Sequence, residues 1–404
     1  MKRRSFLAVS TTVMATSVFA NPAAQRMRVA IIGDTGRGNY GHGLDSMWLK
    51  VPEAEIVAVA DPNASGLKKE LQKLNVSNGF DDYRQMLQEV RPDVVAVCPR
   101  HADQHHDMTL AAIKAGARGI YTEKPFCRTP AEADSILAAC RRHNVKLAVA
   151  HRNRYHPTLQ TIDRLIADGR IGRLLEIRGR GKGDHRGGVE DFWVLGSHVL
   201  NLIHYFGGEP RSCSAVLRHN GRPVVKSDVR EGGEGLGPMA GDELHVRYEM
   251  SSGVIAYFDS IANDGTQGEG FGLQLIGSQG IIAIHCDREP LAHLCLGNPF
   301  QTNDQPRQWV AISTAGPGVP EPRKDLNEMI AHHGLPGRDL IESIREDRKP
   351  ICDAFQGAAT VEMICAAFES HRRQGVAVEL PCTERGNALN HSAASHAIPS
   401  NSAD

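Results

Sequence analysis

The sequence predicts an α/β fold in two parts: an N-terminal doubly wound parallel sheet, then a C-terminal α+β domain with a large, mostly antiparallel open sheet. Short apolar runs alternate with helical segments up to about residue 150, without the period-2 polarity of half-exposed strands. Beyond that point, alternating apolar and polar segments are joined by Gly-containing turns, which indicate hairpins. The length of 404 residues suits two or three domains.

The first domain is predicted over residues 27–150. Buried strands separated by helices are typical of a parallel sheet that is covered on both faces. Strands are expected at 27–34, 54–63, 93–99, 119–125 and 146–153. Helices are expected after the Gly-rich turn that follows the first strand, and at 108–116 and 130–144.

The second domain is predicted over residues 151–383. It begins with an amphipathic helix at 158–172 and closes with helices between 339 and 374. Its strands are expected at 242–250, 253–261, 271–277 and 280–286. Residues 384–404 are polar and rich in Ser, Asn and Ala, which predicts a disordered tail.

Bulk composition excludes several classes of partner. Lys and Arg number 46 and Asp and Glu 47, so the net charge of −1 favours neither nucleic acid nor an anionic membrane surface. No run reaches the length of a membrane span. The nine cysteines are odd in number and form no CxxC pair, so we expect buried thiols. The expected partner is a small molecule.

Residues 1–24 have the order of an export signal. Arg3 and Arg4 precede a modestly apolar stretch that ends in small residues near Ala20. This order resembles a twin-arginine signal, whose route exports folded proteins. We therefore expect a periplasmic or otherwise exported protein; a basic, unstructured start is the alternative.

The first predicted strand runs into the sequence GDTGRGNYGHG. Gly33, Gly36 and Gly38 would let the backbone turn tightly and approach a pyrophosphate at the N-terminus of the following helix. Thr35 stands where the usual G-x-G-x-x-G pattern has its second glycine, and Arg37 lies between the later glycines. This turn is a candidate dinucleotide site.

Asp61 ends the second predicted strand. An acid at this place bonds the ribose hydroxyls of NAD and repels the 2′-phosphate of NADP. NAD is therefore the predicted cofactor, while Lys68 and Lys69 keep NADP possible.

Further residues extend the pattern: Pro99, His105 at the start of the next helix, the tripeptide Glu123-Lys124-Pro125, and RNRYHP after the last strand. Together they resemble the glucose-fructose oxidoreductase and inositol dehydrogenase family, Gfo/Idh/MocA, from Met27 to about Pro381. The resemblance implies an N-terminal Rossmann domain and a homo-oligomer, either a dimer or a tetramer.

By this resemblance Lys124 is a catalytic residue beside the nicotinamide, and Glu123 orients it. Pro99 and His105 are expected to neighbour the cofactor. The residues themselves agree, because Lys124 lies at the carboxyl end of a strand, where doubly wound sheets hold ligands. A neighbouring nicotinamide cation would lower its pKa toward working pH.

The family's second motif, Asp-x-Gly-x-His-x-x-Asp, matches VLGSHVLN. The resemblance makes His198 the general base, while Val194 and Asn201 replace the two aspartates. If the segment is one helix, Asp191 lies two turns before His198 on the same face and could return a carboxylate to the site. Asp191 is therefore a third catalytic candidate.

Substrate contacts are expected from five residues near the predicted cleft: Arg154, Tyr155, Arg186, Glu190 and Asn201. A metal site is not expected. His101, His105, His106 and Asp107 lie close together, but no HxxxH or Cys partner follows them at ligand spacing.

The leading hypothesis is an NAD(P)-dependent oxidoreductase that acts on a sugar or polyol hydroxyl. An exported enzyme meets little free cofactor, so the dinucleotide would be tightly bound and recycled within each cycle. Two alternatives remain open: a redox-neutral NAD-dependent glycosidase or lyase, and a non-catalytic sugar-binding module with a vestigial dinucleotide site.

Overall fold

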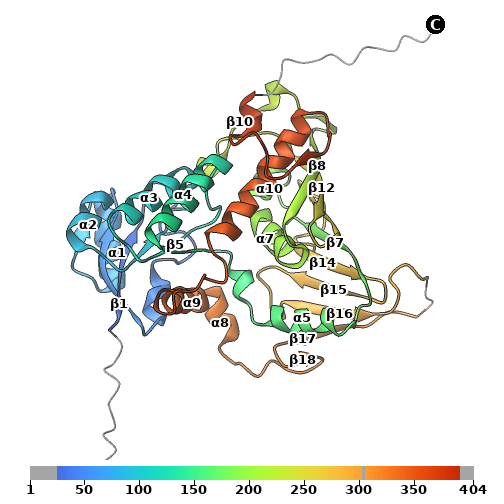
Figure 1. Cartoon of the computed structure of the whole chain (residues 1–404), viewed down its shortest axis with the longest axis horizontal. Coiled ribbons are helices and arrows are strands. Elements are labelled where there is room, and N and C mark those ends of the chain that lie inside the picture. The colour runs from blue at the N-terminus through green and yellow to red at the C-terminus, as the bar shows by residue number, and fades with distance from the viewer. Residues whose placement is uncertain (1–24, 303–304, 392–404) are drawn as a thin grey trace, which may run out of the picture.

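The computed structural model describes residues 25–302 and 305–391. The predicted signal at 1–24 lies outside these residues. Figure 1 shows two domains side by side, with helix α10 (Ala354–Arg372) running between them. Within the described ranges, no helix is both long and apolar enough to cross a bilayer.

The first domain is a six-stranded sheet with the order β3-β2-β1-β4-β5-β6, and every pair in it is parallel. The strands are β1 (Met27–Ile32), β2 (Ala54–Ala60), β3 (Gly79–Phe80), β4 (Val94–Val97), β5 (Gly119–Thr122) and β6 (Lys146–Val149). The order reverses between β1 and β4, which makes a crevice for ligands at the carboxyl ends of these strands. This confirms the predicted doubly wound sheet.

Four helices pack on this sheet: α1 (Ala64–Leu74), α2 (Tyr83–Val90), α3 (His105–Lys114) and α4 (Pro130–His143). The helix expected after the Gly-rich turn is absent. The chain makes successive turns there and then a five-residue 3₁₀ helix, η1 (Ser46–Lys50). Gly38, Gly41 and Gly43 have φ of 95°, 63° and 88°, and Asn39 has φ of 54°. This left-handed backbone cannot continue as an α-helix.

The second domain is built on an eleven-stranded sheet in which all pairs are antiparallel except β13 with β7. Its longer strands are β7 (Leu174–Arg180), β8 (Pro210–His219), β12 (Glu243–Met250), β13 (Ile255–Ile261), β14 (Gly272–Gly277), β15 (Gly280–His285), β16 (Ala292–Leu296) and β17 (Trp309–Ser313). The four predicted strands and the open, mostly antiparallel sheet are confirmed.

Helices α7 (Gly196–Gly207) and α10 cover one face of this sheet, and α5 (Thr158–Ala167) packs against β17. Helix α9 (Gly334–Arg345) returns to the first domain and packs against β5 and β6. The closing segment of the chain therefore helps to fix the first domain against the second.

The predicted tail is partly ordered. Arg385 donates to Glu362 at 2.6 Å and to Asp134 at 2.8 Å, and Leu389 is buried. The prediction of disorder is therefore wrong for residues 384–391, because these contacts tie them to α10 and α4. Residues 392–404 lie outside the described part of the chain. All nine cysteines are buried and free, as expected.

Candidate active site

Lys124 lies two residues beyond the end of β5, between the two domains. Its side chain is buried, and Nζ donates to the carbonyl oxygen of Val194, in the second domain, at 3.2 Å. Burial lowers the pKa of Lys124, although Glu123 opposes this effect. A lowered pKa makes a buried lysine a better candidate for proton exchange with a bound substrate.

A small cavity surrounds this ammonium group. It brings together segments far apart in sequence, and nine residues line it: His42, Glu123, Lys124, Ala150, Arg152, Leu195, His198, Asp287 and His333. The structure thus places Lys124 and His198 together, as predicted. The cavity holds about 50 Å³, room for one or two water molecules.

Several buried polar atoms around the cavity have no hydrogen-bond partner within the described chain. They are both ring nitrogens of His151, Nδ1 of His198 and Nε2 of His333. His151 is 1% exposed, and its ring lies 5.3 Å from that of His198, edge to face. Buried polar groups are normally paired, so this cluster indicates a ligand site.

The three imidazoles are neutral near pH 7. Burial, with Lys124 close by, lowers the pKa of His151 to about 3. Burial lowers the pKa of His333 to about 4 and that of His198 well below its usual range. A neutral imidazole can donate at one nitrogen and accept at the other, which suits hydroxyl groups. Sequence reasoning missed His151 and His333, because a lone histidine carries no pattern.

Glu123 is fully buried beneath the Gly-rich segment. Its Oε2 accepts from the backbone nitrogen of His42 at 2.9 Å and lies 2.8 Å from Nδ1 of the same ring, while Oε1 accepts from the nitrogen of Lys124 at 2.8 Å. Burial opposes its ionisation, but His42 and Lys124 outweigh it and lower the pKa of Glu123. Glu123 is therefore a fixed negative charge beside Lys124.

The catalytic assignment of Asp191 is wrong. The expected single helix is interrupted at Leu195, between α6 (Val189–Val194) and α7, so Asp191 and His198 do not share a face. Asp191 accepts from Ser260 Oγ at 2.5 Å and from the nitrogen of Lys182 at 3.0 Å. It lies outside the cavity, and burial raises its pKa to about 6.

Three of the predicted substrate contacts lie outside the cavity of Lys124. Arg154 stacks over the ring of Tyr205, with its guanidinium carbon 3.7 Å from the ring centroid. The hydroxyl of Tyr155 accepts from the nitrogen of Cys352 at 3.3 Å. Asn201 is fully buried and its Nδ2 has no partner within the described chain, so its contact with a substrate stays a prediction.

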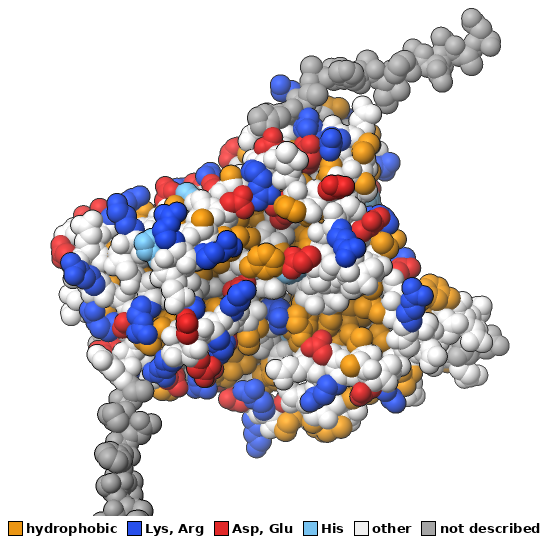
Figure 2. Space-filling view, in the orientation of Figure 1, with side chains coloured by type: hydrophobic (Ala, Val, Ile, Leu, Met, Phe, Trp, Pro, Cys, Tyr) orange, Lys and Arg blue, Asp and Glu red, His pale blue; other side chains and the backbone are white. Residues whose placement is uncertain are grey.

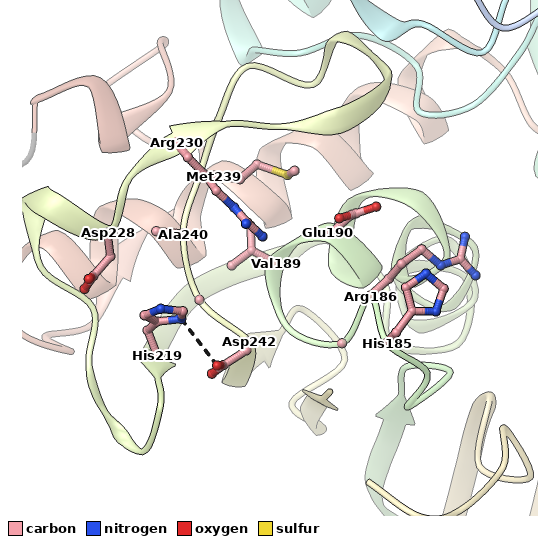
Figure 3. Close-up of a pocket in the computed structure, with 12 residues that line it drawn as sticks. His185, Arg186, Val189, Glu190, His219, Asp228, Arg230, Met239, Ala240 and Asp242 are labelled. Carbon is pink, nitrogen blue, oxygen red and sulfur yellow. Dashed lines mark ion pairs between the residues drawn. The ribbon is translucent and has the colours of Figure 1, made fainter. Parts of the chain in front are cut away.

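Arg186 and Glu190 lie in a different pocket, within the second domain (Figure 3). This pocket lies between the start of α6 and the excursion that connects β8 to β12, and His219, paired with Asp242 at 3.3 Å, also lines it. Neither residue lines the cavity of Lys124. Figure 2 shows that charges of both signs are interspersed over the visible face.

Residues 34–42, here called the glycine loop, lie across the carboxyl ends of β1, β4 and β5. A Cβ at Gly33, just before the loop, would fall 2.1 Å from the ring of Tyr40. One at Gly38 would fall 2.5 Å from the nitrogen of Arg100, and one at Gly41 would fall 2.4 Å from Oε2 of Glu123. The space that a side chain would need at these glycines is therefore occupied by other groups of the same chain.

Asp61, the predicted ribose acid, is fully buried. Its carboxylate accepts from Thr35 Oγ1 at 2.6 Å, from Tyr40 Oη at 2.8 Å, and from the backbone nitrogens of Asn63 and Thr35 at 2.9 and 3.1 Å. Four donors fill the acceptor capacity of a carboxylate. Arg37 pairs with Asp103 at 2.7 Å, and Gly36 donates to Asp34 at 3.1 Å.

His105 and Pro99 take part in contacts that connect two loops at the carboxyl edge of the sheet. The two ring nitrogens of His105 lie 2.8 and 2.7 Å from the carbonyl oxygens of Pro125 and Pro99. Both nitrogens are occupied, so the ring ties the loop after β4 to the loop after β5 and has no free nitrogen for a cofactor.

The residue types at this edge fit a dinucleotide, with an acid after β2, glycines after β1 and a lysine after β5. A pocket of about 190 Å³ also lies at the ends of β1 and β2, lined by Gly33, Asp61, Tyr83 and Met108 among others. The glycine loop, however, lies over the ends of β4 and β5, where the dinucleotide would continue. In this conformation the loop packs on Arg100 and Glu123 at these strand ends.

A parallel nucleotide-type sheet, a buried lysine at its carboxyl edge and a second open-sheet domain define the class of two-domain oxidoreductases. The family models agree: the oxidoreductase family with an NAD-binding Rossmann fold matches residues 27–151, and its C-terminal alpha/beta domain matches residues 148–380. The chain belongs to the Gfo/Idh/MocA oxidoreductase family, which supports NAD as its cofactor.

Among the relatives, D-apiose dehydrogenase of Paraburkholderia graminis is 30% identical over 51% of this chain and 56% of its own length. Levoglucosan dehydrogenase of Pseudarthrobacter phenanthrenivorans is 25% identical over 67% of this chain and 73% of its own length. A solved levoglucosan dehydrogenase in complex with NADH and L-sorbose superposes with a TM-score of 0.68 at 20% identity, over 89% of this chain and 100% of that one. The structural likeness shows the fold.

Proposed function

We propose that this chain is an NAD-dependent oxidoreductase that acts on a hydroxyl group of a sugar or polyol. The observation that carries the proposal is the cavity in which Lys124 meets His198 and the unpartnered nitrogen of His333, with the unpartnered ring of His151 packed against His198. Relatives named as apiose, levoglucosan and glucoside dehydrogenases support a sugar as the substrate class.

Oxidation of a secondary alcohol removes a proton from the hydroxyl oxygen and a hydride, which is a hydrogen with two electrons, from the carbon. A bound nicotinamide supplies the acceptor for that hydrogen. The chain supplies the proton acceptor: the deprotonated form of Lys124, or neutral His198 beside it, takes the hydroxyl proton as the carbonyl forms, and burial lowers the pKa of Lys124. The neutral histidines around the cavity would fix the neighbouring hydroxyl groups.

The two alternative functions are not favoured, because the sugar-related relatives are named dehydrogenases. Tight retention of the cofactor, export by a twin-arginine signal and a dimeric or tetrameric state belong to the proposal as expectations. A sugar or polyol as the substrate class and a preference for NAD over NADP are also expectations of this proposal.

Two measurements test the proposal. Nucleotide extracted from the denatured, purified protein should contain NAD(H), which reports retention. Incubation with NAD and a panel of sugars and polyols should produce absorbance at the NADH wavelength together with an oxidised sugar. Release of an aglycone without oxidised sugar would favour the glycosidase, and ligand binding without turnover would favour the module.

A further inference from the structure

The cavity contains the carboxylate of Asp287, a residue outside the family motif around His198. Asp287 follows β15 in a left-handed turn with φ of 61°, and it lines the same cavity as Lys124 and His198. Val194, at the end of α6, stands where the family motif has its first aspartate, and His198 follows in α7. Asp287 thus brings a negative charge back to the site from the second domain's sheet.

The carboxylate of Asp287 is held on one side only. Its Oδ1 accepts from Nε of Arg152 at 2.8 Å and from Nδ2 of Asn153 at 3.1 Å, and its backbone nitrogen donates to Oδ1 of Asn153 at 3.1 Å. Oδ2 has no hydrogen bond within the described chain, and the side chain is 27% exposed. One oxygen is fixed and the other is left for a ligand.

We infer that Asp287 is a substrate-binding residue, whose free oxygen accepts a hydrogen bond from a sugar hydroxyl beside His198. This inference rests on the proposed function and names the carboxylate that serves it. His198 shares the cavity with Lys124, Arg152, His42, His333 and two carboxylates, Glu123 and Asp287. Glu123 is already paired with His42 and with the nitrogen of Lys124, so Asp287 is the carboxylate with an unpaired oxygen, and its charge favours a proton on the imidazole of His198.

Asp287→Asn tests the inference, because the amide keeps the oxygen bound by Arg152 and replaces the free acceptor by a donor. We expect KM for the sugar substrate to rise about 10- to 100-fold, as for a lost hydrogen bond to a charged group. We also expect the acid limb of kcat/KM to move to lower pH, since the charge that favours protonated His198 is gone.

Glu289→Gln is the matched control, since Glu289 lies in the same loop but pairs with His156 outside the cavity, at 2.8 Å. It should leave KM and the pH profile unchanged. An Asp287→Asn enzyme with unchanged KM and pH profile would overturn the role of Asp287 alone. A wild-type protein that oxidises no sugar would overturn both that role and the proposed function.

Discussion

The two ends of the first domain's carboxyl edge differ in how their central polar groups are paired. At the lysine end, both nitrogens of His151 and one each of His198 and His333 have no partner within the described chain. At the glycine-loop end, Asp61 has four donors, although neighbouring polar atoms such as Oε1 of Gln104 lack a partner among the described residues. The imidazoles are open to a ligand, whereas the carboxylate of Asp61 is paired without one.

This difference teaches how to separate a binding group from a structural one. A buried polar group that is already paired stabilises the fold, and removing it costs stability. An unpaired one costs stability while the ligand is away, and it is retained for binding. The two ends should therefore respond to mutation in opposite ways, in activity at one and in stability at the other.

The largest effect is expected at Lys124. Lys124→Ala should lower kcat about 10²- to 10⁴-fold, the usual contribution of proton transfer by a positioned group. The variant should remain folded with a lower melting temperature, because it removes buried methylene groups and the hydrogen bond to the carbonyl oxygen of Val194. Lys114→Ala, at an exposed position on α3, is the control and should keep full activity. If Lys124→Ala retained turnover, Lys124 would not be the catalytic residue of this site.

The next effect is expected at Asp61. Asp61→Asn replaces one acceptor oxygen by a donor that faces Thr35 and Tyr40, so the free energy of unfolding should fall by about 2 kcal/mol. Urea denaturation measures this, with Asp81→Asn, at an exposed position, as the control. Unchanged stability would mean that the loop is not held by this carboxylate.

His151→Phe should show the opposite pattern. An apolar ring of similar size replaces an imidazole that has no partner, so stability should be kept or raised. The KM for the sugar should rise about 5- to 10-fold, since a hydrogen bond to the ligand is lost. A fall in stability with unchanged KM would place His151 among the structural groups and contradict the assignment.

The smallest effect is a pH dependence of stability at the loop end. Glu70 is buried beside Asp45, and burial together with Asp45 raises the pKa of Glu70 to about 8. The folded state holds a proton that the unfolded state loses above about pH 4.5, so stability should fall as pH rises from about 4.5 to 8. Glu70→Gln should flatten this fall in urea denaturation at pH 5 and 8. An unaltered slope would exclude Glu70 as its source.

Much of the fold could be predicted, because strand and helix patterns are local. The parallel strands at 54–60 and 119–122 read as apolar runs, and the hairpins of the second domain read as alternation. The missing helix after β1 could not be read this way. No α-helix forms there because Gly38 and Gly41 adopt left-handed backbone conformations. Glycine permits that conformation without requiring it, so the sequence does not show where it occurs.

The candidate site divides in the same manner. The sequence by itself determined that Lys124 ends a strand of a doubly wound sheet, because the apolar run and the following proline are adjacent to it in the chain. Only the tertiary structure decided that His151, His333 and Asp287 meet this lysine and that Asp191 does not. Their meeting depends on how two sheets and a returning helix pack, and a break of one residue at Leu195 changes which side chains face the cavity.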